Sequence, residues 1–415
     1  MSRIEELIQQ LCPLGVEIFS LGELGIFENI GVDKKTNVGE KKVMLLNFMD
    51  VMRNKHIHKN ILSMEVSASD SKIEKCDIKQ HDLFITPTSE TRDEIGFAAV
   101  AIEDISDSVY SYHVMRYRLN NKNAVTPYFI RYLFESDDLR IQIYRASKGL
   151  TRYGLSAKDF AKLTIPFPPL DIQEEIVKTL DLFTKLEAEL EAELEARKTQ
   201  YTYYRDALLS FEGKEVEWKT LGEIGEFTRG RRFVKTDILS QGVPCIHYGE
   251  MYTHYKIWAK EAKSFLAPDL AAKLRVAKKG DVVIVAAGET IEDIGQGVAW
   301  LGDEDVVIHD ACFSFRHSLH PNYVSHFTQT DIFHSQIKRY ISSGKISSIN
   351  AAGLSKAKIP VPSFEEQERI ASILDKFHVL INDISTGLPA EIQVRRKQYE
   401  YYRNRLLTFK ELANG

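Results

Sequence analysis

Cysteines are few in this chain, and long apolar runs are absent. The 415 residues include four cysteines, none in a C-x-x-C pair: Cys12, Cys76, Cys245 and Cys312. Isolated thiols in a chain of this size argue against disulfides and zinc, and they predict a reducing cytoplasm. The longest apolar runs, such as "DVVIVAAG", fall far short of the roughly 20 residues that a membrane-spanning helix requires. The start, "MSRIEELIQQLCP", lacks the apolar core of a signal peptide. We therefore expect a cytoplasmic protein without a membrane partner.

A strong excess of one charge sign is also absent. The formal net charge is −5, from 54 basic and 59 acidic residues. Ten acidic and five basic residues lie between Asp171 and Phe211, so this segment carries the whole excess and the remainder is neutral, with 49 of each sign. Any electrostatic footprint for nucleic acid would therefore consist of local basic patches. The length suits two domains of roughly 150 residues plus connectors.

What the chain does contain is an internal repeat. "QYTYYRDALLSF" ends at residue 211 and "QYEYYRNRLLTF" at residue 409, an offset of 198. "LGELGIF" at Leu21 matches "LGEIGEF" at Leu221, and "IPFPPLDIQEEIVKTLDLF" at Ile165 matches "IPVPSFEEQERIASILDKF" at Ile359. Offsets that stay between 194 and 200 over separate blocks indicate a tandem duplication of about 200 residues.

Each repeat has two parts. Short β-rich runs, turn signals and brief helical patches come first and predict a mixed α/β (α+β) domain with a partly antiparallel sheet. Prolines then precede a long helix with apolar residues at intervals of three and four. The predicted organisation is a first domain at 1–164, a helix region at 165–212, a second domain at 213–358 and a second helix region at 359–415. A helix of about 40 residues would be roughly 60 Å long, which is longer than such a domain. We therefore expect the two helices to pack on each other as a coiled coil.

The two helix regions differ at one place. Phe183 to Arg197 is 14 steps, whereas Phe377 to Arg395 is 18. The first interval contains "LEAELEAELEAR", which is rich in helix formers. The second contains "STGLPAEIQ", where Gly387 and Pro389 should break or kink the helix.

Motifs for catalysis are missing. "GEFTRGRR" from Gly225 has the glycine spacing of a phosphate loop, but Arg231 and Arg232 stand where Lys and Ser/Thr are required. No Ser/His/Asp or Cys/His grouping is discernible, and none of the features tested recurs in both repeats. We therefore predict no catalytic, cofactor-binding or metal-binding residue in this chain. A scaffold that recurs with different loops predicts a protein that recognises two different targets held a fixed distance apart.

The sequence resembles the specificity subunit of type I DNA restriction–modification systems over essentially its whole length. The most specific shared element is Pro-x-Pro, a short gap, then Gln and Ile: Pro166, Pro168, Gln173 and Ile176 in one repeat, and Pro360, Pro362, Gln367 and Ile370 in the other. "GLTRYGLSAKDFAKLTIPFP", "GKISSINAAGLSKAKIPVP" and "GDVVIVAAGETIEDIG" are similar to the family as well.

The resemblance implies two target-recognition domains separated by two antiparallel conserved helices, and no catalysis by this chain. It implies binding of double-stranded DNA and of two methyltransferase subunits that use S-adenosylmethionine. Where two restriction subunits join, they carry the ATP- and Mg-dependent cleavage. The twin helix ends would be twin docking sites, and the predicted partner-binding residues are Tyr201, Tyr203, Tyr204, Arg205, Tyr399, Tyr401, Tyr402 and Arg403.

DNA contacts would come from the variable loops, where Arg, Lys, Ser, Thr and Asn reach bases or phosphates. "TRGRRFVK" in the second domain is the strongest candidate. The predicted DNA-binding residues are Lys34, Lys35, Ser89, Thr91, Arg92, Thr151, Arg152 and Tyr153 in the first domain, and Thr228, Arg229, Arg231, Arg232, Lys235, Thr290, Lys345, Ser347 and Ser348 in the second.

Two other functions stay open from sequence. One is a single-chain modification enzyme or nuclease, which would need a cofactor or metal motif. The other is a coiled-coil structural protein whose mixed domains bind other proteins. The recognised DNA sequence and the existence of a restriction subunit are not encoded in any readable motif.

Overall fold

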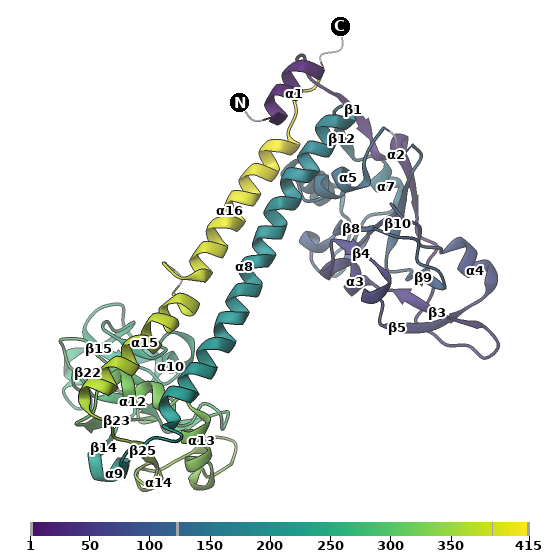
Figure 1. Ribbon diagram of the computed structural model, residues 1–415. Helices are drawn as coiled ribbons and strands as arrows, with labels where there is room; N and C mark the ends of the chain where they lie inside the picture. The colour runs from purple at the N-terminus through teal and green to yellow at the C-terminus, as the bar shows by residue number, and fades with distance from the viewer. Residues whose placement is uncertain (1–2, 122–123, 384, 413–415) are drawn as a thin grey trace. The chain divides into compact units, whose positions relative to one another are not determined.

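The computed structural model describes residues 3–121, 124–383 and 385–412, and the chain divides into two compact units. Unit 1 comprises the residues up to Glu189 together with those from Gln393 onward, and unit 2 comprises Leu190–Ile392. Each unit therefore combines one recognition domain with segments of two long helices (Figure 1). The tandem repeats predicted from sequence are both present as mixed α/β domains, but each compact unit also takes in helix residues from the other repeat.

Unit 1 is built on a five-stranded sheet of order β2-β10-β6-β8-β4. All neighbours are antiparallel except β4 and β8, so the predicted partly antiparallel sheet is confirmed. A three-stranded sheet, β5-β3-β9, packs beside it. The strands are β1 Glu17–Ser20, β2 Gly25–Glu28, β3 Lys41–Leu46, β4 His56–Ile57, β5 Met64–Ala68, β6 Leu83–Ile85, β7 Thr88–Ser89, β8 Ala98–Ala101, β9 Ser108–Tyr110, β10 Met115–Leu119, β11 Tyr153–Gly154 and β12 Thr164–Phe167.

Unit 2 repeats this plan. Its five-stranded sheet has the order β14-β23-β19-β21-β16, again with one parallel pair at the edge, and a four-stranded sheet, β17-β15-β22-β18, accompanies it. The strands are β13 Trp218–Thr220, β14 Gly225–Arg229, β15 Val243–Ile246, β16 Trp258–Ala259, β17 Ser264–Leu266, β18 Val276–Ala277, β19 Val282–Val285, β20 Ala287–Gly288, β21 Gly297–Trp300, β22 Val306–Ile308, β23 Cys312–His317, β24 Ser347–Ser348 and β25 Lys358–Pro360.

Short helices connect the strands in both units. In unit 1 they are α1 Arg3–Leu11, α2 Leu21–Leu24, α3 Phe48–Arg53, η1 Lys59–Ile61, α4 Asp70–Lys75, η2 Arg92–Glu94, α5 Pro127–Leu133, α6 Asp137–Ala146 and α7 Ala157–Ala161. In unit 2 they are α9 Leu221–Ile224, η3 Lys235–Asp237, α10 Glu250–Thr253, α11 Pro268–Ala271, α12 Pro321–Phe327, α13 Asp331–Ile337, η4 Lys338–Tyr340 and α14 Ala351–Leu354. Pro127 and Pro321 open equivalent helices, because a proline costs no hydrogen bond in the first turn.

The "LGE" repeats form the same local structure twice. Ser20 caps α2 and Thr220 caps α9, and the carboxylates of Glu23 and Glu223 accept hydrogen bonds from those residues' backbone N–H and hydroxyl groups. These capping boxes satisfy N–H groups that have no partner in the helix. Gly25 and Gly225 follow, and a Cβ at either would lie within 2.6 Å of a carbonyl oxygen on the neighbouring strand. The close strand approach therefore requires glycine in both copies.

The long helices are α8 Leu170–Ser210, α15 Phe364–Asn382 and α16 Leu388–Leu407. The predicted break in the second helix region is confirmed, because α15 and α16 are separate and Gly387 and Pro389 lie at their junction. The hydroxyl of Ser385, together with the backbone N–H groups of Ser385 and Thr386, donates hydrogen bonds to the Asp383 carboxylate and lowers its pKa to about 2. None of the described helices has the length and apolarity of a membrane span.

Within each unit, two helix segments run antiparallel, as the resemblance implied. In unit 1, the rings of Phe183 on α8 and Tyr402 on α16 stack with centroids 5.5 Å apart, and Arg396 pairs with Glu187 at 2.5 Å. In unit 2, the rings of Tyr204 on α8 and Phe377 on α15 stack at 5.7 Å. The repeat thus places the same aromatic pair at the helix seam of both units.

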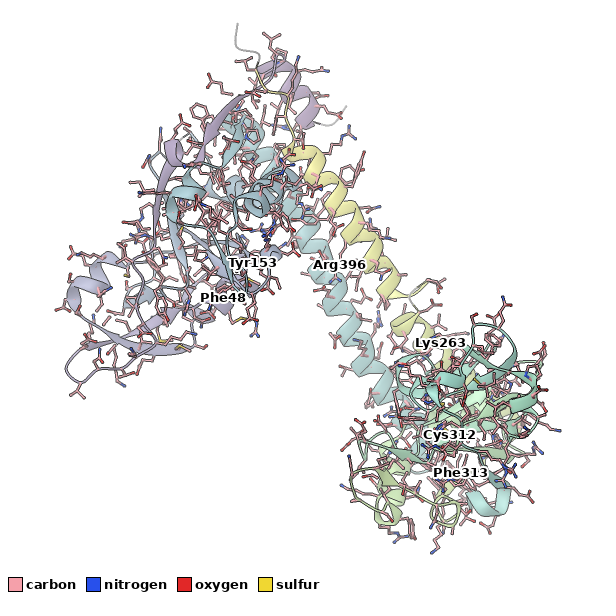
Figure 2. The ribbon with its side chains drawn as sticks, turned by 180° about the vertical axis from the view of Figure 1, so that it is seen from behind. Phe48, Tyr153, Lys263, Cys312, Phe313 and Arg396 are labelled. Atoms are coloured by element: carbon pink, nitrogen blue, oxygen red, sulfur yellow. The ribbon has the colours of Figure 1, made fainter. Side chains whose placement is uncertain are left out.

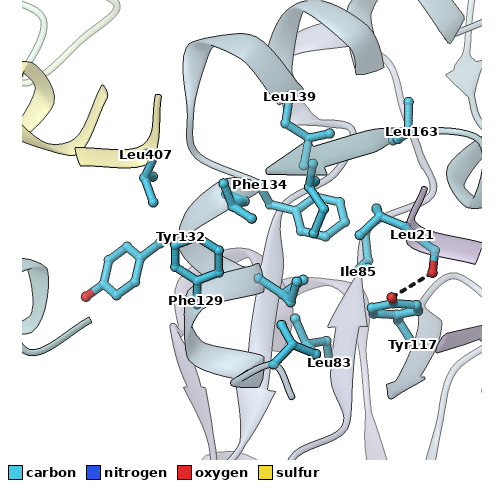
Figure 3. Close-up of a cluster of buried hydrophobic side chains, with 14 of the residues drawn as sticks. Leu21, Leu83, Ile85, Tyr117, Phe129, Tyr132, Phe134, Leu139, Leu163 and Leu407 are labelled. Carbon is cyan, nitrogen blue, oxygen red and sulfur yellow. Dashed lines mark hydrogen bonds between the residues drawn. The ribbon is translucent and has the colours of Figure 1, made fainter. Parts of the chain in front are cut away.

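The end of each long helix lies in the core of a unit made mainly from the other repeat. Tyr399 and Leu407 of α16 join the unit 1 core, where Leu407 lies near Tyr132 and Phe134 (Figure 3). Tyr201 and Leu209 of α8 join the unit 2 core. The two copies of the repeated dodecapeptide are therefore packing elements of opposite units.

A buried glutamine fixes the start of the long helix in each unit. Gln173 is fully buried; its Oε1 accepts from Thr126 N at 3.0 Å and its amide donates to Pro168 O at 2.8 Å. Gln367 is 3% exposed, accepts from His320 N at 2.9 Å and donates to Pro362 O at 2.9 Å. The Pro-x-Pro…Gln motif is thus a structural clamp between the proline turn, the helix and the loop before α5 or α12.

We expect Gln367→Leu to lower the free energy of unfolding of unit 2 by about 1–3 kcal/mol, because it leaves a buried N–H without an acceptor. All three tryptophans, Trp218, Trp258 and Trp300, lie in unit 2, so tryptophan fluorescence in urea reports on this unit. Gln173→Leu in unit 1 and Gln241→Leu at an exposed site should leave the fluorescence midpoint unchanged. An unaltered midpoint in Gln367→Leu would contradict the clamp.

Candidate nucleic-acid interface

Three loops of unit 2 meet at one edge of its recognition domain. β20 pairs with β24, which aligns Gly288 with Ser347 and brings the loop of Thr290 beside the loop of Lys345. The segment after β14 completes the group. The segments 228–235, 287–290 and 345–348 are called the basic loop cluster of unit 2; together with residues 247–248 and 309–311 they surround a cavity of about 530 Å³, and the lining residues include Arg229, Arg232, Lys235, Glu289 and Ile346.

The cations of this cluster are not neutralised by carboxylates. Arg229 Nε donates to the carbonyl of Asp310 at 2.9 Å, and Arg231 Nη1 donates to the carbonyl of Lys273 at 2.8 Å. For Arg232 and Lys235, no carboxylate lies within 4.0 Å among the residues that the structure describes. Hydrogen bonds to carbonyls orient the guanidinium groups but leave their charge available for phosphates.

An aromatic group that the sequence did not reveal lies beside these cations. The rings of His247, Tyr248 and Phe233 surround that of His309, with centroids 4.8, 5.1 and 5.1 Å away. Burial lowers the pKa of both imidazoles, which favours their neutral forms. Arg275, which donates to the carbonyl of Arg229 at 2.8 Å, was also missed. These residues are scattered along the sequence, and only the fold brings them together.

Unit 1 has the equivalent loop arrangement with different residues. β7 pairs with β11, which aligns Ser89 with Tyr153. Arg92 lies between two rings, 5.0 Å from the centroid of Tyr144 and 4.7 Å from that of Tyr153, which is labelled in Figure 2. Arg152 Nη2 lies 3.5 Å from Thr88 Oγ1. We call segments 33–35, 88–92 and 150–153 the basic loop cluster of unit 1.

The predicted lysines, Lys34 and Lys35, belong to this cluster. The charges of Arg152 and Lys34 both lower the pKa of His113, after a larger effect of burial, which places the three groups within electrostatic range. Lys35 Nζ pairs with Asp33 at 2.7 Å, whereas Lys34 has no such partner among the described residues. His113 and Tyr144 are further residues of this region that the sequence did not indicate.

Most predicted DNA-binding side chains are accessible. Ser89 and Ser347 are not, with exposures of 6% and 4%, because each sits in the β pairing that joins two loops. Direct contact of these two hydroxyls with DNA does not fit their burial; the two residues instead join the loops through the β pairing. The half-buried ones are Arg92, Tyr153 and Ser348, and the exposed ones are Lys34, Lys35, Thr91, Thr151, Arg152, Thr228, Arg229, Arg231, Arg232, Lys235, Thr290 and Lys345.

The predicted partner-binding residues fall into two groups. Tyr201 and Tyr399 are each 8% exposed: Tyr201 Oη lies 3.1 Å from His326 Nδ1, and Tyr399 Oη donates to Glu135 at 2.6 Å. Their hydroxyls therefore serve their own units, which does not fit direct docking. Arg205 and Arg403 are largely covered, with side-chain exposures of 12% and 15%. The exposed members recur at matching values: Tyr203 68% and Tyr401 60%, Tyr204 40% and Tyr402 40%.

The described residues contain neither a cluster that could hold a metal ion nor an activated thiol at Cys245 or Cys312. Among them, no group of three His, Cys, Asp or Glu side chains could hold a metal ion. Burial raises the pKa of the Cys245 and Cys312 thiols to about 12, so neither is a ready nucleophile. What the two units share is an accessible, positively charged loop cluster on a duplicated scaffold, which is an arrangement suited to binding a polyanion.

Comparisons with known proteins agree with this geometry. A family model described as "Type I restriction modification DNA specificity domain" matches residues 13–196 and 213–394, once in each repeat. The chain is 37% identical over 271 residues to the type I restriction enzyme EcoR124I/EcoR124II specificity subunit of Escherichia coli, covering 60% of this chain and 63% of that subunit, less than two thirds of its length. It is 31% identical over 244 residues to the E. coli EcoprrI specificity subunit, covering 54% of this chain and 55% of that one.

Solved structures share the fold. A chain from a study of assembly and conformational transition of the type I R-M system matches with a TM-score of 0.65 at 18% identity, over 96% of this chain and 98% of that one. The HsdS subunit from Thermoanaerobacter tengcongensis matches with a TM-score of 0.53 at 17% identity, over 96% of both chains. The relatives named here are specificity subunits, which agrees with the prediction of a recognition role without catalysis. Because the family model covers most of its length, the chain belongs to the type I restriction–modification DNA specificity subunit family.

Proposed function

We propose that this chain reads a bipartite DNA target, one half-site per unit, within a type I restriction–modification complex. The observation that carries the proposal is the pair of basic loop clusters, which occupy equivalent places on the duplicated scaffold but present different side chains. The matched loops offer Lys34 and Lys35 in unit 1 against Arg231 and Arg232 in unit 2. Equivalent placement with unequal chemistry favours two different half-sites. We place the chain in the cytoplasm because we expect it to act on chromosomal DNA.

The proposed partners follow from the duplication. Two identical methyltransferase subunits would dock on the two equivalent sets of exposed tyrosines and methylate opposite strands. S-adenosylmethionine would be held by those subunits, and ATP and Mg²⁺ by restriction subunits where these join. The aromatic side chains at 203–204 and 401–402 are of the residue types that anchor protein interfaces.

The charge of the unit 2 loop cluster can be tested by its salt dependence. We expect Arg231→Ala with Arg232→Ala to weaken DNA binding by the methyltransferase-bound chain and to reduce the slope of log K against log salt by about two, since each phosphate contact contributes roughly 0.9. A filter-binding or anisotropy titration at several salt concentrations measures this.

The matched control is Lys278→Ala with Lys279→Ala. These exposed lysines precede β19, at the strand end opposite to the loop cluster, so the slope should stay as in the unaltered chain. Equal slopes for both double variants would remove segment 228–235 from the DNA site.

The exposed tyrosines can be tested by counting bound subunits. We expect Tyr203→Ala with Tyr204→Ala to release one methyltransferase subunit, while the other stays docked through Tyr401 and Tyr402. Native mass spectrometry gives the count, and Tyr340→Ala in the short helix η4 of unit 2 is the control. Two retained subunits at unchanged affinity would contradict the docking assignment.

The helix repeat can be tested by its length. Deleting Leu190, Glu191, Ala192 and Glu193 shortens α8 by about 6 Å and rotates its later residues by roughly 40°. Because base pairs rise about 3.4 Å, we expect the gap of the target to shorten by one or two base pairs while both half-sites stay the same. Methylation-site mapping of the variant measures this. Altered half-sites, or an unchanged gap with full activity, would contradict the idea that the helices set the spacing.

A further inference from the structure

Each unit contains a cavity beside the end of a long helix. In unit 2 the cavity is about 310 Å³, and its walls include Lys198, Tyr201, Thr202, Arg205, Lys256 and Gln329. In unit 1 it is about 450 Å³, and its walls include Lys55, Arg131, Glu135, Arg140, Tyr399 and Arg403. These cavities are called the helix-end pockets, and their residues are distinct from those of the unit 2 basic loop cluster and its cavity.

The two pockets share a tyrosine–arginine pair from the repeated dodecapeptide. Tyr201 and Arg205 correspond to Tyr399 and Arg403 at the offset of 198. The guanidinium carbon lies 5.9 Å from the ring centroid in unit 2 and 5.6 Å in unit 1. In both pockets an arginine therefore lies beside a tyrosine ring, at a distance within the range of a cation–π interaction.

The unit 2 pocket is positively charged. Its cations are Lys198, Arg205 and Lys256, and no Asp or Glu is among the described residues that line it. Arg205 Nε pairs with Asp206 at 2.8 Å and Lys198 with Glu195 at 2.7 Å, but Lys256 has no ion-pair partner in the described part of the chain.

The unit 1 pocket also has unsatisfied cationic groups. Lys55 Nζ lies 5.3 Å from the Tyr399 ring centroid and donates to Thr184 Oγ1 at 3.3 Å, with no carboxylate within 4.0 Å in the described ranges. Burial lowers the pKa of this ammonium group. Arg131 is 2% exposed and pairs with Glu135, yet its Nε has no acceptor among the described residues. Five cations line this pocket against three carboxylates.

Comparison of the repeats indicates which ligand the pockets take. A partner that is the same for both units must be recognised by residues that the repeats retain, whereas two different half-sites must be read by residues that differ. The Tyr–Arg pair is retained, and the loop residues differ, as Arg152 against Ile346 shows at matched positions of the β7–β11 and β20–β24 pairings. The retained, net positive pockets thus fit a negatively charged group on a partner present in two copies.

We infer that each helix-end pocket receives a carboxylate-bearing side chain from one methyltransferase subunit, with Arg205 or Arg403 as its ionic partner. The inference rests on the proposed docking of two methyltransferase subunits and names the pocket and the chemistry of that docking. A carboxylate that enters the pocket is bound by a preplaced, partly desolvated guanidinium group, where an ion pair is stronger than at an exposed surface.

The test reverses the charge of each pocket in the full-length chain. Arg403→Glu and Arg205→Glu should each weaken one of the two methyltransferase binding steps by roughly tenfold or more, and the double variant should weaken both. Arg403→Lys should retain most of the affinity. Lys397→Glu, an exposed site on α16 outside the pocket, is the control and should bind both subunits normally. Native mass spectrometry gives the count, calorimetry the affinities, and circular dichroism shows that each variant is folded.

The outcomes separate this inference from the proposed function. If the unaltered chain binds no methyltransferase subunit, the proposed function fails and the inference with it. If the unaltered chain binds two and the folded double variant also binds two at unchanged affinity, the inference alone is overturned. A double variant that keeps both subunits but loses DNA affinity and salt dependence would assign the pockets to DNA phosphates, and would also overturn it.

Discussion

The burial of each long helix end in a core built mainly from the other repeat is the constraint on which the structure depends. Unit 1 needs Tyr399 and Leu407, and unit 2 needs Tyr201 and Leu209. Neither recognition domain completes its core from its own repeat, so both copies of the dodecapeptide must keep the same apolar pattern. This explains why one chain contains nearly the same twelve residues twice, and why these residues changed less than the loops.

The same constraint separates recognition from assembly within one chain. Buried positions of the helices, the glutamine clamps at Gln173 and Gln367 and the capping boxes are shared by both units, because each supports an identical scaffold. The loops at the strand ends do not support the scaffold in this way, so their cations and aromatic groups can differ between the two units. A duplicated scaffold with divergent loops can therefore offer two equal surfaces to a repeated partner and two unequal surfaces to DNA.

Sequence reasoning predicted the features that depend on local pattern. The duplication, the mixed α/β domains, the long helix at Leu170–Ser210 and the break at Gly387 all follow from periodicity or residue type, and the structure confirms them. The sequence could not predict that each helix end packs in the unit built mainly from the other repeat. Apolar residues at helical spacing do not indicate which surface they pack against. The aromatic cluster that His247, Tyr248 and Phe233 form around His309 was missed for the same reason. Ser89 and Ser347 were assigned to DNA by type, but β pairing buries them.

The central claim, that two units read two half-sites of one target, is tested most directly by mapping methylated bases across a genome. A host that expresses this chain with its methyltransferase is compared with the same host expressing the methyltransferase alone. The account predicts methylation that depends on this chain and falls in a single motif of two specific half-sites with a fixed, unspecified gap. A motif without a gap, or no methylation that depends on the chain, would contradict it.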